Sequence, residues 1–325
     1  MKHFYRIAAV LGAALLLLSG AWATPETVIP GGNTVALRLE TDGVCIVEFA
    51  EDYPKNAGLR RGDLLHSIDG AEVRSAQAVA QAVAASDGRP MKLTVTRGGR
   101  EKSVTVAPHE TKDGWRLGIY VRDRMSGIGT VTFYDAENET FGALGHGICE
   151  SGSSELLPVR SGSVLYAEVM AVTKGKSGAA GALQGAVCGR SACGEISGNT
   201  RQGVFGTMPA RNAQPVPVGK ASELHTGAAT ILSNVRGQEI REYSVQIRAI
   251  HPDEPQGRNL LLQVTDPALL EATGGIVQGM SGSPIMQDGK LVGAVTHVLI
   301  DDPTMGYGIL IEAMLDAQSA QAKAA

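Results

Sequence analysis

Aromatic side chains are scarce in this chain: five Phe and two Trp stand beside 41 glycines in 325 residues. Such a composition fits many short strands joined by turns better than long helices. An apolar fraction of 43% still supplies enough material for real cores, which excludes a disordered protein. We therefore expect mainly β structure in one large or two moderate domains.

Clusters of basic residues are also absent, and the formal net charge is −4. Neither feature suits nucleic-acid binding, so we expect no nucleic-acid partner. The four cysteines, Cys45, Cys149, Cys188 and Cys193, form no C-x-x-C pair, and the histidines are scattered singly. We therefore expect no structural zinc and no other metal or cofactor. Disulfides are permitted in an exported chain, but spacing does not choose among the pairings.

The one long apolar run lies at the amino terminus. Lys2 and Arg6 precede the apolar segment Ile7–Leu18, and Ala21-Trp22-Ala23 supplies small residues at cleavage positions. Residues 1–23 are therefore predicted to be an export signal, or else a retained anchor that contacts the membrane. In both cases the rest of the chain is expected outside the cytoplasm.

A small α+β unit is predicted at residues 33–110, after a linker at residues 24–32. Its signature is A-G-L-x-x-G-D-x-L-x-x-I-D-G from Ala57 to Gly70, and Ser75 then caps a helix over Ala76–Ala85. This order resembles a bacterial PDZ domain. The resemblance implies that a peptide ligand adds as a strand beside Val35, Ala36 and Leu37. Asn33-Thr34-Val35-Ala36 replaces the family's glycine-rich carboxylate loop, and a rigid spacer role is the alternative.

Residues 115–320 have a different composition and hydrophobic pattern. Short apolar runs alternate with glycine-rich turns, and helical periodicity is missing until residues 311–325. Many short strands with turn signals predict a sandwich or barrel.

The strongest chemical motif is Gly279-Met280-Ser281-Gly282-Ser283-Pro284, followed by a predicted hairpin. A serine between glycines can present its hydroxyl while the amides of Gly279 and Ser281 stay free to stabilise an oxyanion. The string resembles the nucleophile turn of chymotrypsin-like proteases. An ordinary Gly/Ser turn is the alternative.

A serine nucleophile needs a base that is neutral near pH 7, and histidine is the usual partner. His146 is favoured because small residues surround it in the segment 142–148. His297 is the rival, since it is close to Ser281 in sequence, but it falls within a predicted strand. Thr296 beside it is a weak candidate for substrate binding.

A carboxylate is expected to orient the histidine. Asp266, at the end of an apolar strand, and Asp135, before His146, are equally placed by spacing alone, and each can instead cap a turn.

Taken together, the segments 28–32, 142–148, 265–267, 274–284, 293–297 and 302–308 resemble the stage IV sporulation protein B peptidase family. The resemblance implies a chymotrypsin-like double β-barrel and a triad of His146, Asp266 and Ser281. An Asp only fifteen residues before the serine would come from the second barrel, which is unusual for that fold.

The same resemblance implies an exported serine endopeptidase that works between mother cell and forespore. It would cleave a membrane-bound regulator of an intramembrane metalloprotease, promote late sigma-factor activation and cut itself. Two alternatives stay open: a non-catalytic PDZ adaptor, and a quality-control protease of the HtrA type, which normally carries its PDZ domain after the protease domain.

Overall fold

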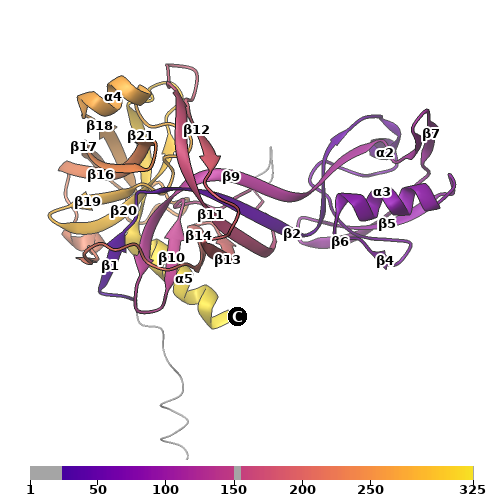
Figure 1. Cartoon of the computed structure of the whole chain (residues 1–325), viewed down its shortest axis with the longest axis horizontal. Coiled ribbons are helices and arrows are strands. Elements are labelled where there is room, and N and C mark those ends of the chain that lie inside the picture. Colours follow the sequence, from indigo (N-terminus) through magenta and orange to yellow (C-terminus); the bar gives the residue numbers. More distant parts are fainter. Residues whose placement is uncertain (1–23, 150–154, 325) are drawn as a thin grey trace, which may run out of the picture.

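The computed structural model describes residues 24–149 and 155–324, so the predicted signal segment 1–23 lies outside the described residues. Strands dominate, as predicted, and the molecule consists of two packed β-barrels with a smaller unit set apart from them (Figure 1). Within the described part of the chain, no helix is long and apolar enough to cross a membrane.

The carboxy-terminal barrel is a closed ring of six strands. In ring order they are β16 (Gly227–Arg236), β17 (Glu239–Ile250), β18 (Leu260–Val264), β21 (Met305–Leu310), β20 (Lys290–Val298) and β19 (Pro284–Gln287). Its strands alternate inward and outward side chains, as β17 shows with Tyr243, Val245 and Ile247 buried between more exposed neighbours. Helix α4 (Pro267–Thr273) follows β18, and its Leu269 is completely buried in the same core.

The amino-terminal barrel also closes, because β2 pairs with both β9 and β11. Its ring order is β2 (Thr34–Phe49), β9 (Ile119–Asp135), β10 (Thr140–Ala143), β14 (Gly203–Thr207), β13 (Gly194–Thr200) and β11 (Val159–Thr173). The additional strands are β1 (Thr27–Pro30), β12 (Ala182–Val187) and β15 (Val216–Pro217), which pair with β9, β11 and β1 respectively. The predicted double β-barrel is confirmed.

A short 3₁₀ turn, η1 (Ala221–Glu223), leads from the first barrel into the second. Helix α5 (Ile311–Ala324) closes the chain, as predicted for its end. It contacts β20 and β21 of one barrel and β10 and β14 of the other, and its buried Met314 and Leu315 share a core cluster with Phe133 and Phe205. The helix therefore joins the two barrels on the side where the chain ends.

The third unit has the PDZ pattern of elements. They are α2 (Tyr53–Asn56), β3 (Leu64–Ile68), β4 (Ala71–Glu72), α3 (Ala76–Ala85), β5 (Met91–Arg97), β6 (Arg100–Val106), β7 (His109–Thr111) and β8 (Gly114–Arg116). Ser75 caps α3 as predicted, with its side chain accepting from the Ala78 amide at 3.0 Å. In the glycine-aspartate motif, Asp63 is fully buried and both its oxygens accept from the Arg97 guanidinium at 2.6 Å.

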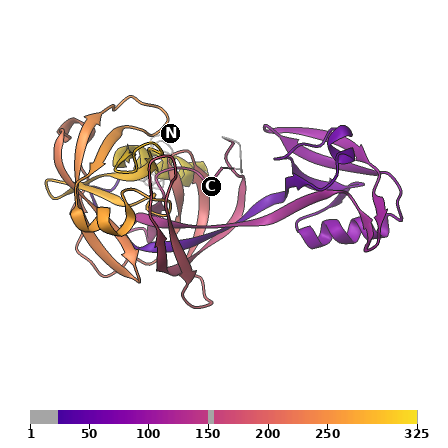
Figure 2. The same cartoon turned by 90° about the horizontal axis from the view of Figure 1, so that it is seen from above.

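This PDZ unit is inserted into the first barrel instead of preceding it. Strand β2 runs from the barrel into the PDZ unit and β9 returns from the PDZ unit to the barrel, and the two strands pair as a two-stranded ribbon, which Figure 2 shows from above. The first half of β2 pairs on both sides within the barrel, so this strand joins the barrel to the predicted unit 33–110. The register shifts between Glu40 and Cys45, and the segment beyond that shift belongs to the PDZ unit.

Candidate active site

The motif around Ser281 forms a tight turn between α4 and β19. Gly279 and Gly282 have φ values of +98° and +95°, a region that side chains rarely adopt. A Cβ on Gly282 would lie 2.1 Å from the Thr130 carbonyl oxygen, so the turn also needs glycine for its close approach to β9. The sequence therefore specifies a turn that presses its backbone against the first barrel.

Strand β9 holds this turn through the carbonyl groups of the turn. The Thr130 amide donates to the Ser281 carbonyl at 3.0 Å, and its hydroxyl donates to the Gly279 carbonyl at 2.8 Å. The Thr132 hydroxyl donates to the Gly282 carbonyl at 2.8 Å. With these carbonyls fixed toward β9, the amides of Gly279 and Ser281 have no recorded protein acceptor among the described residues. They can serve as the predicted oxyanion donors.

His146 follows β10 on a strained stretch of backbone. Leu144, although bulky and buried, has φ +70°, and Gly145 has φ +68°. A left-handed conformation at a bulky residue costs about 1–3 kcal/mol and persists only where the surroundings impose it. Here the Leu144 amide donates to the Thr130 carbonyl at 3.2 Å. The same residue of β9 thus positions both the serine turn and the start of the histidine loop.

The tautomer of His146 follows from the hydrogen bond that its ring makes with Gly147. Its Nδ1 lies 3.0 Å from the Gly147 carbonyl oxygen, and since a carbonyl can only accept, Nδ1 must donate. In the neutral ring Nε2 then carries the free lone pair that a general base needs. Burial is the main cause that lowers the pKa of His146 below its ordinary value of 6.5, and the bond to Gly147 opposes this.

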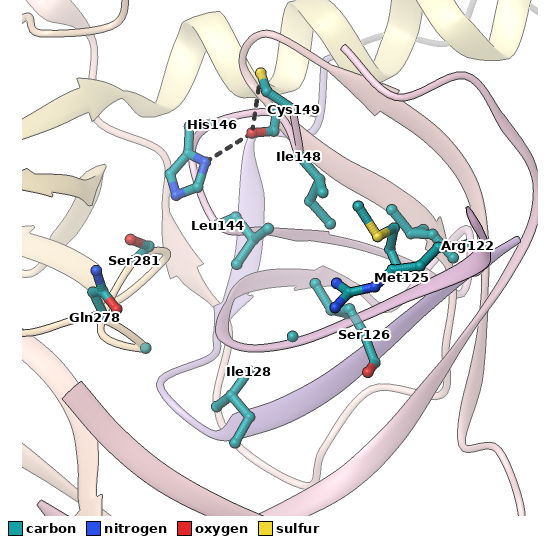
Figure 3. A pocket seen from close by; sticks show the side chains of 15 residues that line it. Arg122, Met125, Ser126, Ile128, Leu144, His146, Ile148, Cys149, Gln278 and Ser281 are labelled. Atoms are coloured by element: carbon teal, nitrogen blue, oxygen red, sulfur yellow. Dashed lines mark hydrogen bonds between the residues drawn. The ribbon is translucent and has the colours of Figure 1, made fainter. Parts of the chain in front are cut away.

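His146 and Ser281 line one cavity of about 430 Å³. In Figure 3 both lie on the same side of that cavity, with Arg122 and Met125 on the other side. The Ser281 hydroxyl donates to the Thr296 carbonyl at 2.8 Å, so it must rotate before it can give a proton to His146. The hydroxyl of Thr296 itself donates to the Tyr307 carbonyl within the sheet. Its backbone, and not the predicted side chain, therefore contacts the site.

His297 lies beside the base. The two imidazole rings have centroids 5.3 Å apart and are tilted by 38°. Burial, followed by the charges of His146 and Arg258, lowers the pKa of His297 to about 4. A neutral His297 adds no positive charge next to His146 at neutral pH, which leaves the base free to take up a proton.

Asp266 is not brought together with His146. It is the N-cap residue of α4, and its Oδ1 accepts from the amides of Ala268 and Leu269 at 2.9 and 3.1 Å. Its Oδ2 accepts from the Ser244 amide at 3.2 Å. Asp266 lines neither of the cavities that contain His146. The carboxylate implied by the family resemblance is engaged in holding a helix start and a neighbouring strand.

Asp135, the other candidate from sequence, also caps a turn. Its Oδ1 accepts from the amides of Glu137 and Asn138, and its Oδ2 accepts from the Asn138 side chain at 2.7 Å. Within the described residues, then, no recorded hydrogen bond joins a carboxylate to His146. The Gly147 carbonyl takes the position at Nδ1 that a carboxylate has in a Ser-His-Asp triad. Likewise, none of these residues forms a group of three His, Cys, Asp or Glu side chains placed for a metal ion.

The expected peptide edge at Val35, Ala36 and Leu37 needs correction. These residues pair with β9 on one side and β11 on the other, so their backbone has no free edge to offer a ligand. The open edge lies instead on β9 at Ile119–Val121, which pairs only with β2 in the part of the chain described, and α3 packs nearby. Gly118, with φ +65° between Leu117 and Ile119, introduces this edge. The expectation placed the edge on the wrong strand of the ribbon.

Two β-barrels that bring a serine, a histidine with a free Nε2 and two unpaired amides to one cavity define a serine endopeptidase of the chymotrypsin type. The chain belongs to the SpoIVB peptidase S55 family, whose sequence profile matches residues 113–315. The PDZ domain profile matches residues 34–107.

Other similarities are partial. A putative zinc metalloprotease, LL2128 of Lactococcus lactis, is 31% identical over 64 residues, which are 20% of this chain and 15% of that protein. The chain thus spans under a sixth of that curated relative. The PDZ domain of the SdrC-like protein Lmo2051 from Listeria monocytogenes is 25% identical, covering 25% of this chain and 87% of that one, with a TM-score of 0.23.

Two solved proteases are similar to a larger part of the chain. The active form of the Rv3671c protease from M. tuberculosis is 16% identical over 61% of this chain and 74% of its own, with a TM-score of 0.35. The HtrA-type protease AlgW with a decapeptide is 14% identical over 63% and 55%, with a TM-score of 0.37.

Proposed function

We propose that this chain is an exported serine endopeptidase of sporulation signalling. Its substrate would be a membrane-bound regulator of an intramembrane metalloprotease, and cleavage would promote activation of a late sigma factor. Membership of the SpoIVB peptidase S55 family supports this assignment. Self-cleavage during maturation is part of the same proposal, as is a location between mother cell and forespore, with residues 1–23 as signal or anchor.

The observation that carries the catalytic part is the fixed tautomer of His146 beside Ser281. Ser281 Oγ leaves the Thr296 carbonyl, transfers its proton to His146 Nε2 and attacks the scissile carbonyl. The amides of Gly279 and Ser281 then stabilise the oxyanion, and losing one such donor costs about 3 kcal/mol of transition-state stabilisation. His146 finally donates its proton to the leaving amine, and water releases the acyl group by the reverse sequence.

The PDZ unit is proposed to bind a peptide along β9 at Ile119–Val121, by adding it as a strand. The same strand continues past the catalytic cavity to Thr130. A substrate held at the PDZ edge would therefore lie on the strand that leads to the nucleophile.

Labelling with a fluorophosphonate tests the catalytic part. The native protein should be modified at Ser281, whereas Ser281→Ala should not react and His146→Ala should react far more slowly. Incubation with the regulator in membranes, followed by mass spectrometry of the fragments, tests the signalling part. Normal labelling with an intact regulator would reject that substrate and keep the enzyme.

A further inference from the structure

Two cavities meet at the catalytic histidine. The first contains Ser281 and Arg122, and the second, of about 460 Å³, contains Arg258 and His297. Both are lined by His146, Gly147 and Cys149. A peptide that places its scissile bond at Ser281 can therefore extend into both cavities.

The charge that lines these cavities is opposite in sign to that of the whole chain, which has a formal charge of −4. Arg122 lines the first cavity, and Arg201 and Arg258 line the second. No Asp or Glu lines either cavity in the described part of the chain. A peptide entering from either side thus meets positive charge that no carboxylate among the described lining residues neutralises.

None of the three guanidinium groups is recorded in an ion pair within residues 24–149 and 155–324. Arg124, two positions after Arg122 on the same strand, is in contrast paired with Glu40. Arg258 lies over the Tyr307 ring at 5.4 Å, which fixes its position without using its charge on a carboxylate. Arg122, Arg201 and Arg258 are thus the cations available to a bound ligand.

Apart from Arg122, the catalytic pair, Cys149, and the uncharged polar residues Ser126 and Gln278, the first cavity is lined by apolar side chains and glycines. Its side chains include Leu37, Leu39, Met125, Ile128, Leu144 and Ile148. Figure 3 shows the Arg122 side chain among them, across the cavity from Ser281. An apolar substrate side chain fits next to the nucleophile, and an acidic group fits at the far wall.

We propose that this peptidase selects substrates with acidic residues on both sides of the scissile bond, and with an apolar residue between the bond and the acidic group that meets Arg122. The proposal rests on the peptidase function above and names its substrate class. Opposite charges across an interface contribute to specificity and to the rate of encounter. Because the arginines are exposed, the selectivity falls as salt concentration rises.

Binding to the Ser281→Ala variant tests the proposal without requiring cleavage. The probes are three fluorescent peptides of one apolar sequence, flanked on both sides by Glu, Gln or Lys. The Glu peptide should bind about tenfold more tightly than the Gln peptide at low salt, and the Lys peptide most weakly. The added substitution Arg122→Gln should reduce the Glu preference about threefold, and Arg122→Glu should favour Lys on that side. Arg248→Gln, on an exposed part of β17, removes the same charge elsewhere and should change nothing.

Equal binding of the Glu and Gln peptides overturns the proposal, as does a Glu preference that survives replacement of all three arginines by glutamine. Cleavage assays with native protein separate this failure from failure of the enzyme. Ser281-dependent cleavage of Glu and Gln peptides at equal rates rejects the selectivity and keeps the peptidase. Selective binding with no cleavage of any peptide supports the recognition and rejects the peptidase.

Discussion

Replacing Asp266 by Asn separates the two roles that this residue can have. As the N-cap of α4 it accepts from the amides of Ala268 and Leu269, and Asn caps a helix about as well as Asp does. Since no recorded bond joins Asp266 to His146, Asp266→Asn should keep kcat within about threefold of the native value. Asp266→Ala should instead lower the free energy of unfolding by about 1 kcal/mol, because the cap is lost.

If Asp266 instead acts in a triad, Asp266→Asn should lower kcat much more. Converting the orienting Asp of a Ser-His-Asp enzyme to Asn lowers kcat about 10⁴-fold, which corresponds to about 5 kcal/mol of transition-state stabilisation. The assay is steady-state cleavage of a fluorogenic peptide by native protein, Asp266→Asn and Asp266→Ala, with urea denaturation of each. A loss of 10³-fold or more in Asp266→Asn at unchanged stability would show that Asp266 orients His146 during catalysis, contrary to its resting position.

Three further outcomes are expected. Thr130→Val leaves the Gly279 carbonyl without its donor and should lower kcat about tenfold or more, with KM nearly unchanged. A native kcat would show that the Thr130 hydroxyl does not position the serine turn. Because burial lowers the pKa of His146 and only the neutral ring is a base, kcat/KM should fall on acidification with a midpoint below 6.5; a midpoint above 7 contradicts this. Arg97→Met leaves Asp63 buried without its cation and should destabilise the PDZ unit by about 3 kcal/mol in urea unfolding, whereas the double variant with Asp63→Asn recovers part of the loss.

The sequence predicts turns and helix caps well, because all the residues that determine them lie in one short segment. The glycines beside Ser281 predict the tight turn because few residues tolerate the backbone there, and Ser75 predicts its helix because a cap acts within one turn. His146 was selected by its small neighbours, and it does line the cavity with Ser281.

Contacts between distant segments were not readable. Thr130 is an ordinary strand residue in sequence, and its bonds to the serine turn join positions about 150 residues apart, with no periodic signal to reveal them. The same difficulty hid the PDZ insertion. In sequence, Thr34–Leu39 and Val44–Phe49 look like two strands of one PDZ domain, although both belong to the single strand β2 and its first half lies in a barrel. Gly118, which introduces the free edge, lies beyond the expected end of the domain, so the peptide edge was placed on Val35–Leu37.

Because the PDZ unit is inserted within the first barrel, truncating the chain from either terminus cannot remove it alone. A cut between Glu40 and Met125 places Thr34–Leu39 and Ile128–Asp135 on two separate fragments. Both segments remain hydrogen-bonded as strands of the first barrel, whose core contains Val131. A single nick there would yield two fragments that remain associated, and only denaturation would part them. Joining Glu40 to Met125 by a short turn would turn the ribbon into a plain hairpin, a direct way to obtain the two barrels alone.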